Sequence, residues 1–303
     1  MNKTVSPFSH YVGIDWSGAK GKSHPGLQVA IAEPGTSAPS IVKPPRGVNW
    51  SRNELVDYLL VLAKNSNRGK PTLAGLDFAF AHPFSDFGQY FPGNKKSPKN
   101  VSSLWALVEE VNFNEVDLYG GAIFRHPVWS DYYIAPPNYT GSKYQSRRRL
   151  TEVVAGNLGQ FPSLTFKAVG PDNVSTGSLA GMRLLYQIKK RLGPKVMIWP
   201  FEMFNVDKTQ LVLVEVFPSF YFAKIDMPSK NKAAAESYFL SRALSKYNSE
   251  GVDPNFISSC RDADDADAII SAAAIRYLSK FVGFNLPAEI LQAAKFEGWI
   301  YGV

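Results

Sequence analysis

Cysteine and histidine are scarce in this sequence. Cys260 is the only cysteine, so the chain can form neither an internal disulfide nor a thiolate metal cluster. The four histidines, His10, His24, His82 and His126, are scattered along the chain. Because zinc sites draw mainly on cysteine and histidine, this composition does not favour a zinc enzyme. The lack of disulfides is typical of the reducing cytoplasm, where we expect the protein.

Long apolar runs are also lacking. No uninterrupted apolar stretch approaches the ~20 residues that a membrane-spanning helix needs, and residues 1–10 have no apolar segment of the kind found in signal peptides. Internal repeats and low-complexity tracts are absent as well. We therefore expect a soluble protein with no membrane partner, and the sequence leaves its oligomeric state open.

What is present suits a globular enzyme. The 303 residues are 45% hydrophobic and 19% charged, enough to bury a large core. A net charge of +7 favours an acidic partner, with nucleic acid as the first candidate. Many proteins of this size are mildly basic without binding a polyanion, so charge alone does not decide the matter.

The order of apolar segments predicts an α/β fold. Apolar runs bounded by turn residues predict strands, and 3.6-residue periodicity predicts helices. Ser51 and Glu54 have the spacing of a capping box and mark the start of the first helix. Residues 73–80 are apolar almost throughout, which predicts a central strand covered on both faces. Strands are predicted at 11–15, 27–32, 40–43, 73–80, 196–204 and 210–216, and helices from Ser51 and at 101–111, 179–192, 231–247 and 264–281.

Residues 81–177 differ from the rest of the chain. They are rich in proline, glycine, asparagine and aromatic residues, with one clear helical pattern. Long ordered loops of this kind tend to be functional. We interpret the chain as a single domain, residues 1–303, in which 81–177 form an inserted subdomain or a lid.

Carboxylates stand at positions where apolar residues or turns would be expected. Asp15 ends the first strand, Asp77 lies within the fourth, and Glu215 interrupts the apolar run of the last. Asp264 and Asp267 open the last long helix. An unpaired buried carboxylate is costly, so such residues are neutralised or bound to a cation. Several of them meeting at one point would form a divalent metal site.

Each carboxylate also has an ordinary structural explanation. Asp15 and Asp77 could end strands through turns, Glu215 could face solvent at a sheet edge, and Asp264 and Asp267 could favour the positive end of the helix dipole. Residues three apart share a helix face, however. On that face the two aspartates are followed by small residues that would let the helix lie close to the sheet, whereas Asp262 and Asp265 fall off the face and are expected to be solvated. The small residues begin at Ala268, Ser271 and Ala272.

Taken together, these motifs resemble the ribonuclease H-like superfamily, and in particular a prokaryotic family of predicted RNase H-like nucleases. The resemblance rests on residues 13–19 (GIDWSGA), 75–79 (GLDFA), 214–219 (VEVFPS), 264–268 (DDADA) and 297–300 (EGWI). It implies a five-stranded mixed sheet flanked by helices, with the active site at the strand ends and residues 81–177 inserted after the fourth strand. It also implies that Asp15, Asp77, Glu215, Asp264 and Asp267 are catalytic metal ligands, with either Asp77 or Glu215 in the middle role.

The chemistry expected of such a site is phosphodiester hydrolysis. Hard oxygen ligands select Mg²⁺ or Mn²⁺, and two such ions can activate water and stabilise the leaving oxygen. Asp15 would bridge the two ions. His82 follows the Asp77 strand closely enough to reach the site, although a role as a loop residue is the simpler interpretation.

Basic residues interleaved with aromatics suggest where DNA or RNA would bind. Such clusters make phosphate contacts and stack bases, although they can equally be a solvated face. The nucleic-acid-binding candidates are Lys95, Lys96, Arg147, Arg148 and Arg149.

Two alternative functions remain from the sequence. One is an ATP-dependent phosphotransferase of the actin-like superfamily, which would be expected to carry a duplicated domain and a glycine-rich adenosine motif; neither is found here. The other is a non-catalytic nucleic-acid-binding protein on the same fold.

Overall fold

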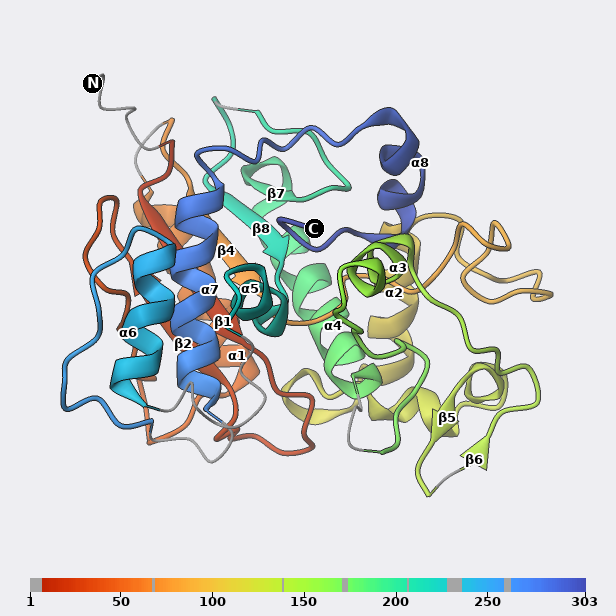
Figure 1. Ribbon diagram of the computed structural model, residues 1–303. Helices are drawn as coiled ribbons and strands as arrows, with labels where there is room; N and C mark the ends of the chain where they lie inside the picture. Colours follow the sequence, from red (N-terminus) through yellow and green to blue (C-terminus); the bar gives the residue numbers. More distant parts are fainter. Residues whose placement is uncertain are drawn as a thin grey trace.

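A six-stranded mixed sheet forms the centre of the molecule (Figure 1). The computed structural model describes residues 7–66, 69–137, 139–170, 174–205, 207–227, 236–258 and 263–303. The strand order across the sheet is β3-β2-β1-β4-β8-β7. β1 pairs antiparallel with β2, and β2 with β3, whereas β1, β4, β8 and β7 run parallel. The strands are β1 (His10–Asp15), β2 (Gln28–Ala32), β3 (Ser40–Ile41), β4 (Thr72–Leu76), β7 (Val196–Ile198) and β8 (Leu211–Glu215).

The predicted α/β class is confirmed, but the five-stranded count is wrong. The sixth strand is β7, a short parallel edge strand whose Val196 is in register with Leu211 of β8. The expected strands at 73–80 and 196–204 are also shorter than predicted. Both end where the backbone turns, after Leu76 and after Ile198. Apolar composition continues past these points because the following residues are buried in loops.

Helices cover both faces of the sheet, because the strand residues alternate between two apolar clusters. Val12 and Ile14 of β1 belong to the cluster formed with α1 (Arg52–Asn65), α2 (Val101–Asn112) and α4 (Ser175–Leu192). Tyr11 belongs to the cluster on the opposite face, with α5 (Pro218–Lys224), α6 (Ser237–Lys246) and α7 (Asp264–Leu278). Figure 1 shows α6 and α7 side by side on that face. We call the two faces of the sheet the α4 face and the α7 face, after the helix that packs on each.

Helix α7 lies directly on β1. A Cβ atom on Gly13 would be 2.1 Å from the carbonyl oxygen of Ala268 and 2.5 Å from the amide nitrogen of Ala272. Real Cβ atoms do not approach other atoms so closely, so only glycine fits at position 13. The small residues that the sequence placed on this helix face do allow the close contact that was predicted.

The helix boundaries follow from local signals where such signals exist. Ser51 and Glu54 form the predicted capping box at the start of α1. The helix predicted at 231–247 is described only as α6, because residues 228–235 lie outside the described part. Three helices lack a strong periodic pattern and were not predicted: α3 (Leu150–Asn157), α5 and α8 (Ala288–Glu297).

Residues 81–177 pack into the α4-face cluster. The buried Phe91, Trp105 and Phe166 belong to the same apolar cluster as Val12 and Ile14 of β1. The segment therefore shares the core of the sheet. Besides α2 and α3 it contains η1 (Val116–Leu118), η2 (Gly121–Arg125), η3 (Ser130–Tyr132), β5 (Ile134–Ala135) and β6 (Tyr139–Thr140), while η4 (Gly193–Lys195) follows α4.

The helices of the described ranges include none with the length and apolar character required to cross a membrane.

Candidate active site

Parallel strands bring three of the predicted carboxylates to one edge of the sheet. Ile14, Leu76 and Glu215 stand in one row across β1, β4 and β8. Asp15 and Asp77 form the next row, where the amide of Asp77 donates to the carbonyl of Ile14 at 3.0 Å. Because side chains alternate along a strand, the row of Asp15 and Asp77 belongs to the α7 face and Glu215 to the α4 face.

Asp15, Asp77 and Asp267 form the first group, which we call the acidic edge. The carboxyl groups of Asp15 and Asp77 are hydrogen-bonded to each other. Two ionised carboxylates are both acceptors, so this bond requires a shared proton. Burial, together with the charge of Glu215, raises the pKa of Asp77 to about 7. Burial raises the pKa of Asp267 well above its ordinary value, and the charges of Asp77, Asp264 and Asp265 add to the effect.

The other aspartates of α7 point elsewhere. An Oδ atom of Asp264 lies 3.2 Å from the position that a Cβ on Gly26 would take, so Asp264 faces the turn before β2. Asp265 was expected to be solvated, and this is wrong. Its side chain is buried, and its carboxylate accepts hydrogen bonds from the Ser258 hydroxyl and from the amide of Ala266. Asp262 lies outside the described residues.

Glu215 belongs to a second group on the α4 face, the Arg149 cluster. Arg149 donates to both oxygens of Glu215, at 2.7 and 2.6 Å, and to Glu152 at 2.8 Å. The amide of Phe80 donates to Glu215 at 3.1 Å. All three charged side chains are buried. The two carboxylates raise the pKa of Arg149 above its ordinary value despite its burial, and burial raises that of Glu152. Glu215 is thus already paired with a cation of the protein.

The predicted row of three basic residues at 147–149 is not exposed as a row. Arg147 is buried because it holds the loop after β4, where it is ion-paired with Asp86 and donates to the carbonyl of Tyr90. Arg149 is buried because it is paired with Glu152 and Glu215. The expectation that these two face solvent is wrong. Lys95, Lys96 and Arg148 are exposed.

His82 also has a structural position. It is fully buried, its two ring nitrogens are hydrogen-bonded to Thr165 and Tyr133 at 2.9 Å each, and its ring stacks on Phe166. Burial holds its pKa well below the ordinary value. The ring is fixed in the core of the 81–177 segment, as the simpler interpretation of the sequence had it.

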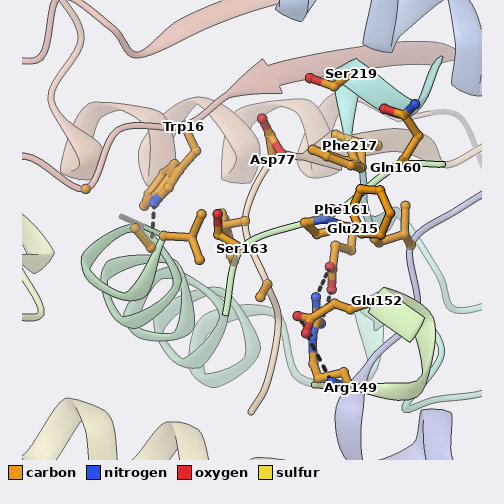
Figure 2. A pocket seen from close by; sticks show the side chains of 18 residues that line it. Trp16, Asp77, Arg149, Glu152, Gln160, Phe161, Ser163, Glu215, Phe217 and Ser219 are labelled. Carbon is orange, nitrogen blue, oxygen red and sulfur yellow. Dashed lines mark hydrogen bonds and ion pairs between the residues drawn. The ribbon is translucent and has the colours of Figure 1, made fainter. Parts of the chain in front are cut away.

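A cavity of about 570 Å³ lies between the acidic edge and the Arg149 cluster. Asp77 lines it from the acidic edge, and Arg149, Glu152 and Glu215 line it from the Arg149 cluster. Figure 2 shows the Glu215 carboxylate directed at Arg149 and the Asp77 carboxylate directed away from that pair. The other walls of the cavity come from the start of α4, the loop after α3 and the start of α5.

Comparison with known proteins gives no match. None of the family profiles, curated proteins or solved structures compared with the chain is similar to it. The function must therefore be argued from the site itself.

The described carboxylates differ in how well they fit a divalent metal ion. Among the described residues, no three histidine, cysteine, aspartate or glutamate side chains already surround a point as ligands. The donor chemistry of the acidic edge nevertheless fits Mg²⁺ or Mn²⁺, because its oxygens are hard ligands. The pKa of Asp267 is raised by burial and by the charges of neighbouring carboxylates, so a bound cation would relieve the repulsion between these carboxylates. Glu215 fits poorly, because Arg149 already occupies both of its oxygens.

The C-terminal motif has a role that sequence reasoning missed. The Glu297 carboxylate accepts hydrogen bonds from the amides of Phe84, Ser85 and Leu150 at 2.6–2.7 Å, which ties α8 to the loop after β4 and to α3. Gly298 has a φ of +79°, and a Cβ there would lie 3.3 Å from a Glu215 oxygen. The EGWI motif that contributed to the resemblance was the available signal, but only the fold shows that it supports the Arg149 cluster.

Proposed function

We propose that the protein is a metal-dependent nuclease of the RNase H-like type, hydrolysing phosphodiester bonds of nucleic acid. One observation carries the proposal. Asp15 at the end of β1, Asp77 directly after the parallel strand β4, and Asp267 of α7 lie at one edge of the sheet. There the carboxyls of Asp15 and Asp77 share a hydrogen bond, and the pKa values of Asp77 and Asp267 are raised. Such crowding is destabilising in a purely structural role and is typical of a functional site.

The arrangement of the sheet supports the same proposal. The mixed order of antiparallel β1 to β3 followed by parallel β4 and β8 provides the helix-flanked sheet that the resemblance implies, with β7 added at one edge. The acidic edge lies at the carboxyl ends of its central strands, where ligands commonly bind in α/β proteins.

The acidic edge would hold the metal. Asp15, Asp77 and Asp267 are the ligands that we propose, with Asp264 one turn away on the same helix. A bound Mg²⁺ or Mn²⁺ supplies an activated water at neutral pH and stabilises charge on the phosphoryl oxygens. Of the two candidates for the middle role, we assign Asp77, because it is hydrogen-bonded to Asp15, whereas Glu215 is paired with Arg149 on the other face.

The remaining groups of the site orient these ligands. Gly13 lets α7 lie against β1 and so sets the position of Asp267 relative to Asp15. Arg149 fixes Glu215, whose charge in turn raises the pKa of Asp77. Asp77 can therefore keep a proton near neutral pH and release it when a cation binds. Metal affinity should accordingly rise with pH.

The proposed substrate is nucleic acid because the chain carries a net charge of +7 and exposes Lys95, Lys96 and Arg148. These side chains offer phosphate contacts outside the acidic edge.

The proposal is tested by a cleavage screen with Mg²⁺ and Mn²⁺. Single strands, duplexes, hybrids and branched junctions of DNA and RNA are incubated with wild type, with Asp15→Asn and with Asp207→Asn. Asp207 is an exposed aspartate in the loop before β8, is not one of the proposed ligands, and serves as the matched control. We expect metal-dependent cleavage by wild type and by Asp207→Asn, and none by Asp15→Asn.

A melting experiment on the same proteins gives a readout independent of turnover. Because a ligand that binds only the folded state raises the melting temperature, millimolar Mn²⁺ should stabilise wild type, Asp207→Asn and Glu215→Gln but not Asp77→Asn. Nucleic-acid binding without cleavage would instead favour the non-catalytic alternative. Stabilisation by ATP without nucleic-acid binding would favour the phosphotransferase.

A further inference from the structure

The cavity beside the acidic edge is larger than catalysis at three carboxylates requires. At about 570 Å³ it falls within the range of ~300–1,000 Å³ typical of small-molecule sites. Among the three carboxylates of the acidic edge, Asp77 lines the cavity. A group occupying the cavity would therefore lie next to a phosphodiester placed over the acidic edge.

Aromatic side chains form much of the cavity wall. The Trp16 ring lies 4.9 Å from the Phe78 ring, and its indole N–H donates to the carbonyl of Gly177 at 2.8 Å, so this side is rigid. Phe161 lines the cavity from the loop after α3 and is 71% exposed. Phe217 lies at the start of α5 (Figure 2). A phenylalanine so exposed at the mouth of a cavity offers a flat apolar surface to a ligand.

The charge of the cavity excludes a phosphate as its occupant. Asp77, Glu152 and Glu215 contribute carboxylates to the lining. The cation among them, Arg149, is engaged with Glu152, both oxygens of Glu215 and the carbonyl of Glu297. A neutral planar ring fits this environment better than an anion does. The Gln160 amide also lines the cavity, where it can meet polar atoms at the edge of such a ring.

We propose that this cavity binds one unpaired nucleobase adjacent to the scissile phosphodiester, with Phe161 and Phe217 as stacking surfaces. The inference rests on the proposed nuclease function and narrows its substrate to single-stranded or locally unpaired nucleic acid. A base inside a continuous duplex is stacked on both faces and paired with the opposite strand, so it cannot enter a cavity. Stacking on aromatic side chains is tolerant of base identity, so we expect little sequence preference at this position.

The test is binding of labelled oligonucleotides, measured by fluorescence anisotropy in EDTA so that no bond is cleaved. Wild type is compared with Phe161→Ala, Phe161→Trp and Leu158→Ala. Leu158 is an exposed apolar residue of the same loop that does not line the cavity, so it is the matched control. Phe161→Ala should bind a single strand about tenfold more weakly, given the usual strength of base–aromatic stacking. Phe161→Trp and Leu158→Ala should bind like wild type.

An abasic scan then locates the base. Replacing one nucleotide at a time by an abasic site should reveal one position at which wild type loses about as much affinity as Phe161→Ala does. At that position Phe161→Ala should lose nothing further, since the same contact is already absent. A perfect duplex should bind more weakly than the same duplex with one unpaired base.

The outcomes separate the two proposals. Cleavage with equal binding by Phe161→Ala and Leu158→Ala, or an abasic scan without a sensitive position, overturns the base-binding cavity and leaves the nuclease proposal standing. The absence of both cleavage and binding by wild type overturns both.

Discussion

Single residues at this site are held in states that they would not adopt alone. Asp77 is the clearest case, because burial and the charge of Glu215 raise its pKa to about 7, whereas the pKa of an aspartate in an unfolded chain is about 4. The folded, metal-free protein therefore binds a proton at Asp77 more tightly than the unfolded chain does. This contribution to stability is complete below about pH 4 and is lost as the pH rises through 7.

Asp77→Asn should remove that pH dependence. The amide has no proton to lose, so the metal-free variant should be more stable than wild type at pH 8 by about 1–3 kcal/mol, and the difference should shrink toward pH 5. Urea unfolding in EDTA at several pH values measures it, with Asp207→Asn as the control. A wild type whose stability rises between pH 5 and 8 in the same way as that of Asp77→Asn would contradict the prediction.

Arg149 illustrates the opposite situation, a buried cation that two carboxylates need. Arg149→Met leaves Glu152 and Glu215 without their partner and should destabilise the protein by about 3–5 kcal/mol, since uncompensated buried charge is costly. Thermal and chemical unfolding measure the loss. Adding Glu215→Gln should recover part of it, and Arg148→Ala, at the exposed neighbouring arginine, should change stability by less than about 0.5 kcal/mol. Equal effects at 148 and 149 would show that the cluster is energetically unimportant.

Among the elements, the contact of α7 with β1 determines whether the acidic edge can form. Asp15 ends β1, Asp77 directly follows β4, and Asp267 is on α7, so the spacing between helix and strands sets the separation of the three carboxylates. Gly13 makes that spacing possible.

Gly13→Ala should therefore disturb both folding and metal binding. The added Cβ would overlap the Ala268 carbonyl at 2.1 Å, and a backbone shift is the only relief. We expect a loss of at least about 2 kcal/mol of stability and a weaker rise of melting temperature with Mn²⁺. The matched control is Gly156→Ala in α3, where the nearest atom to a new Cβ is 3.5 Å away, so the higher helix propensity of alanine should leave stability unchanged or slightly raised. A Gly13→Ala protein as stable as that control would exclude close α7 packing.

The elements differ in how well the sequence foretells them. Capping at Ser51, the apolar strands and the small-residue face of α7 are local patterns, and they predicted α1, the sheet and the close approach of α7 to the sheet. Helices α3, α5 and α8 have no comparable local signal, because their amphipathic stripes are short or interrupted. The pairing of Glu215 with Arg149 joins residues 66 positions apart, and nothing in either local sequence specifies it. The sequence thus nominated the carboxylates, and only the alternation of side chains across β4 and β8 divided them between two faces.

For the molecule as a whole, the net charge is +7, but only some of the basic side chains are exposed to a partner. Arg147 and Arg149 form buried ion pairs within the protein, whereas Lys95, Lys96 and Arg148 are exposed on the 81–177 segment.

Replacing Lys95, Lys96 and Arg148 together by alanine should weaken nucleic-acid binding to a similar extent for all sequences. The slope of log affinity against log salt should flatten by about 0.7 per lost contact on a single strand. The Mn²⁺-dependent rise in melting temperature should survive, because none of the three is a proposed ligand. A salt titration of binding provides the measurement, and an unchanged slope would exclude this surface from the interface.

The three hydrogen bonds that the Glu297 carboxylate accepts also bear on when the site can form during synthesis of the chain. A ribosome delivers β1, β4 and Arg149 before β8, then α7, and Glu297 later still. The Arg149 cluster gains its support from α8 only when Glu297 reaches the amides of Phe84, Ser85 and Leu150, and the acidic edge lacks Asp267 until α7 has emerged. A chain still attached to the ribosome, and so surrounded by RNA, would hold Asp15 and Asp77 without their third partner. If the acidic edge holds the metal as we propose, cleavage would begin only after α7 has been synthesised.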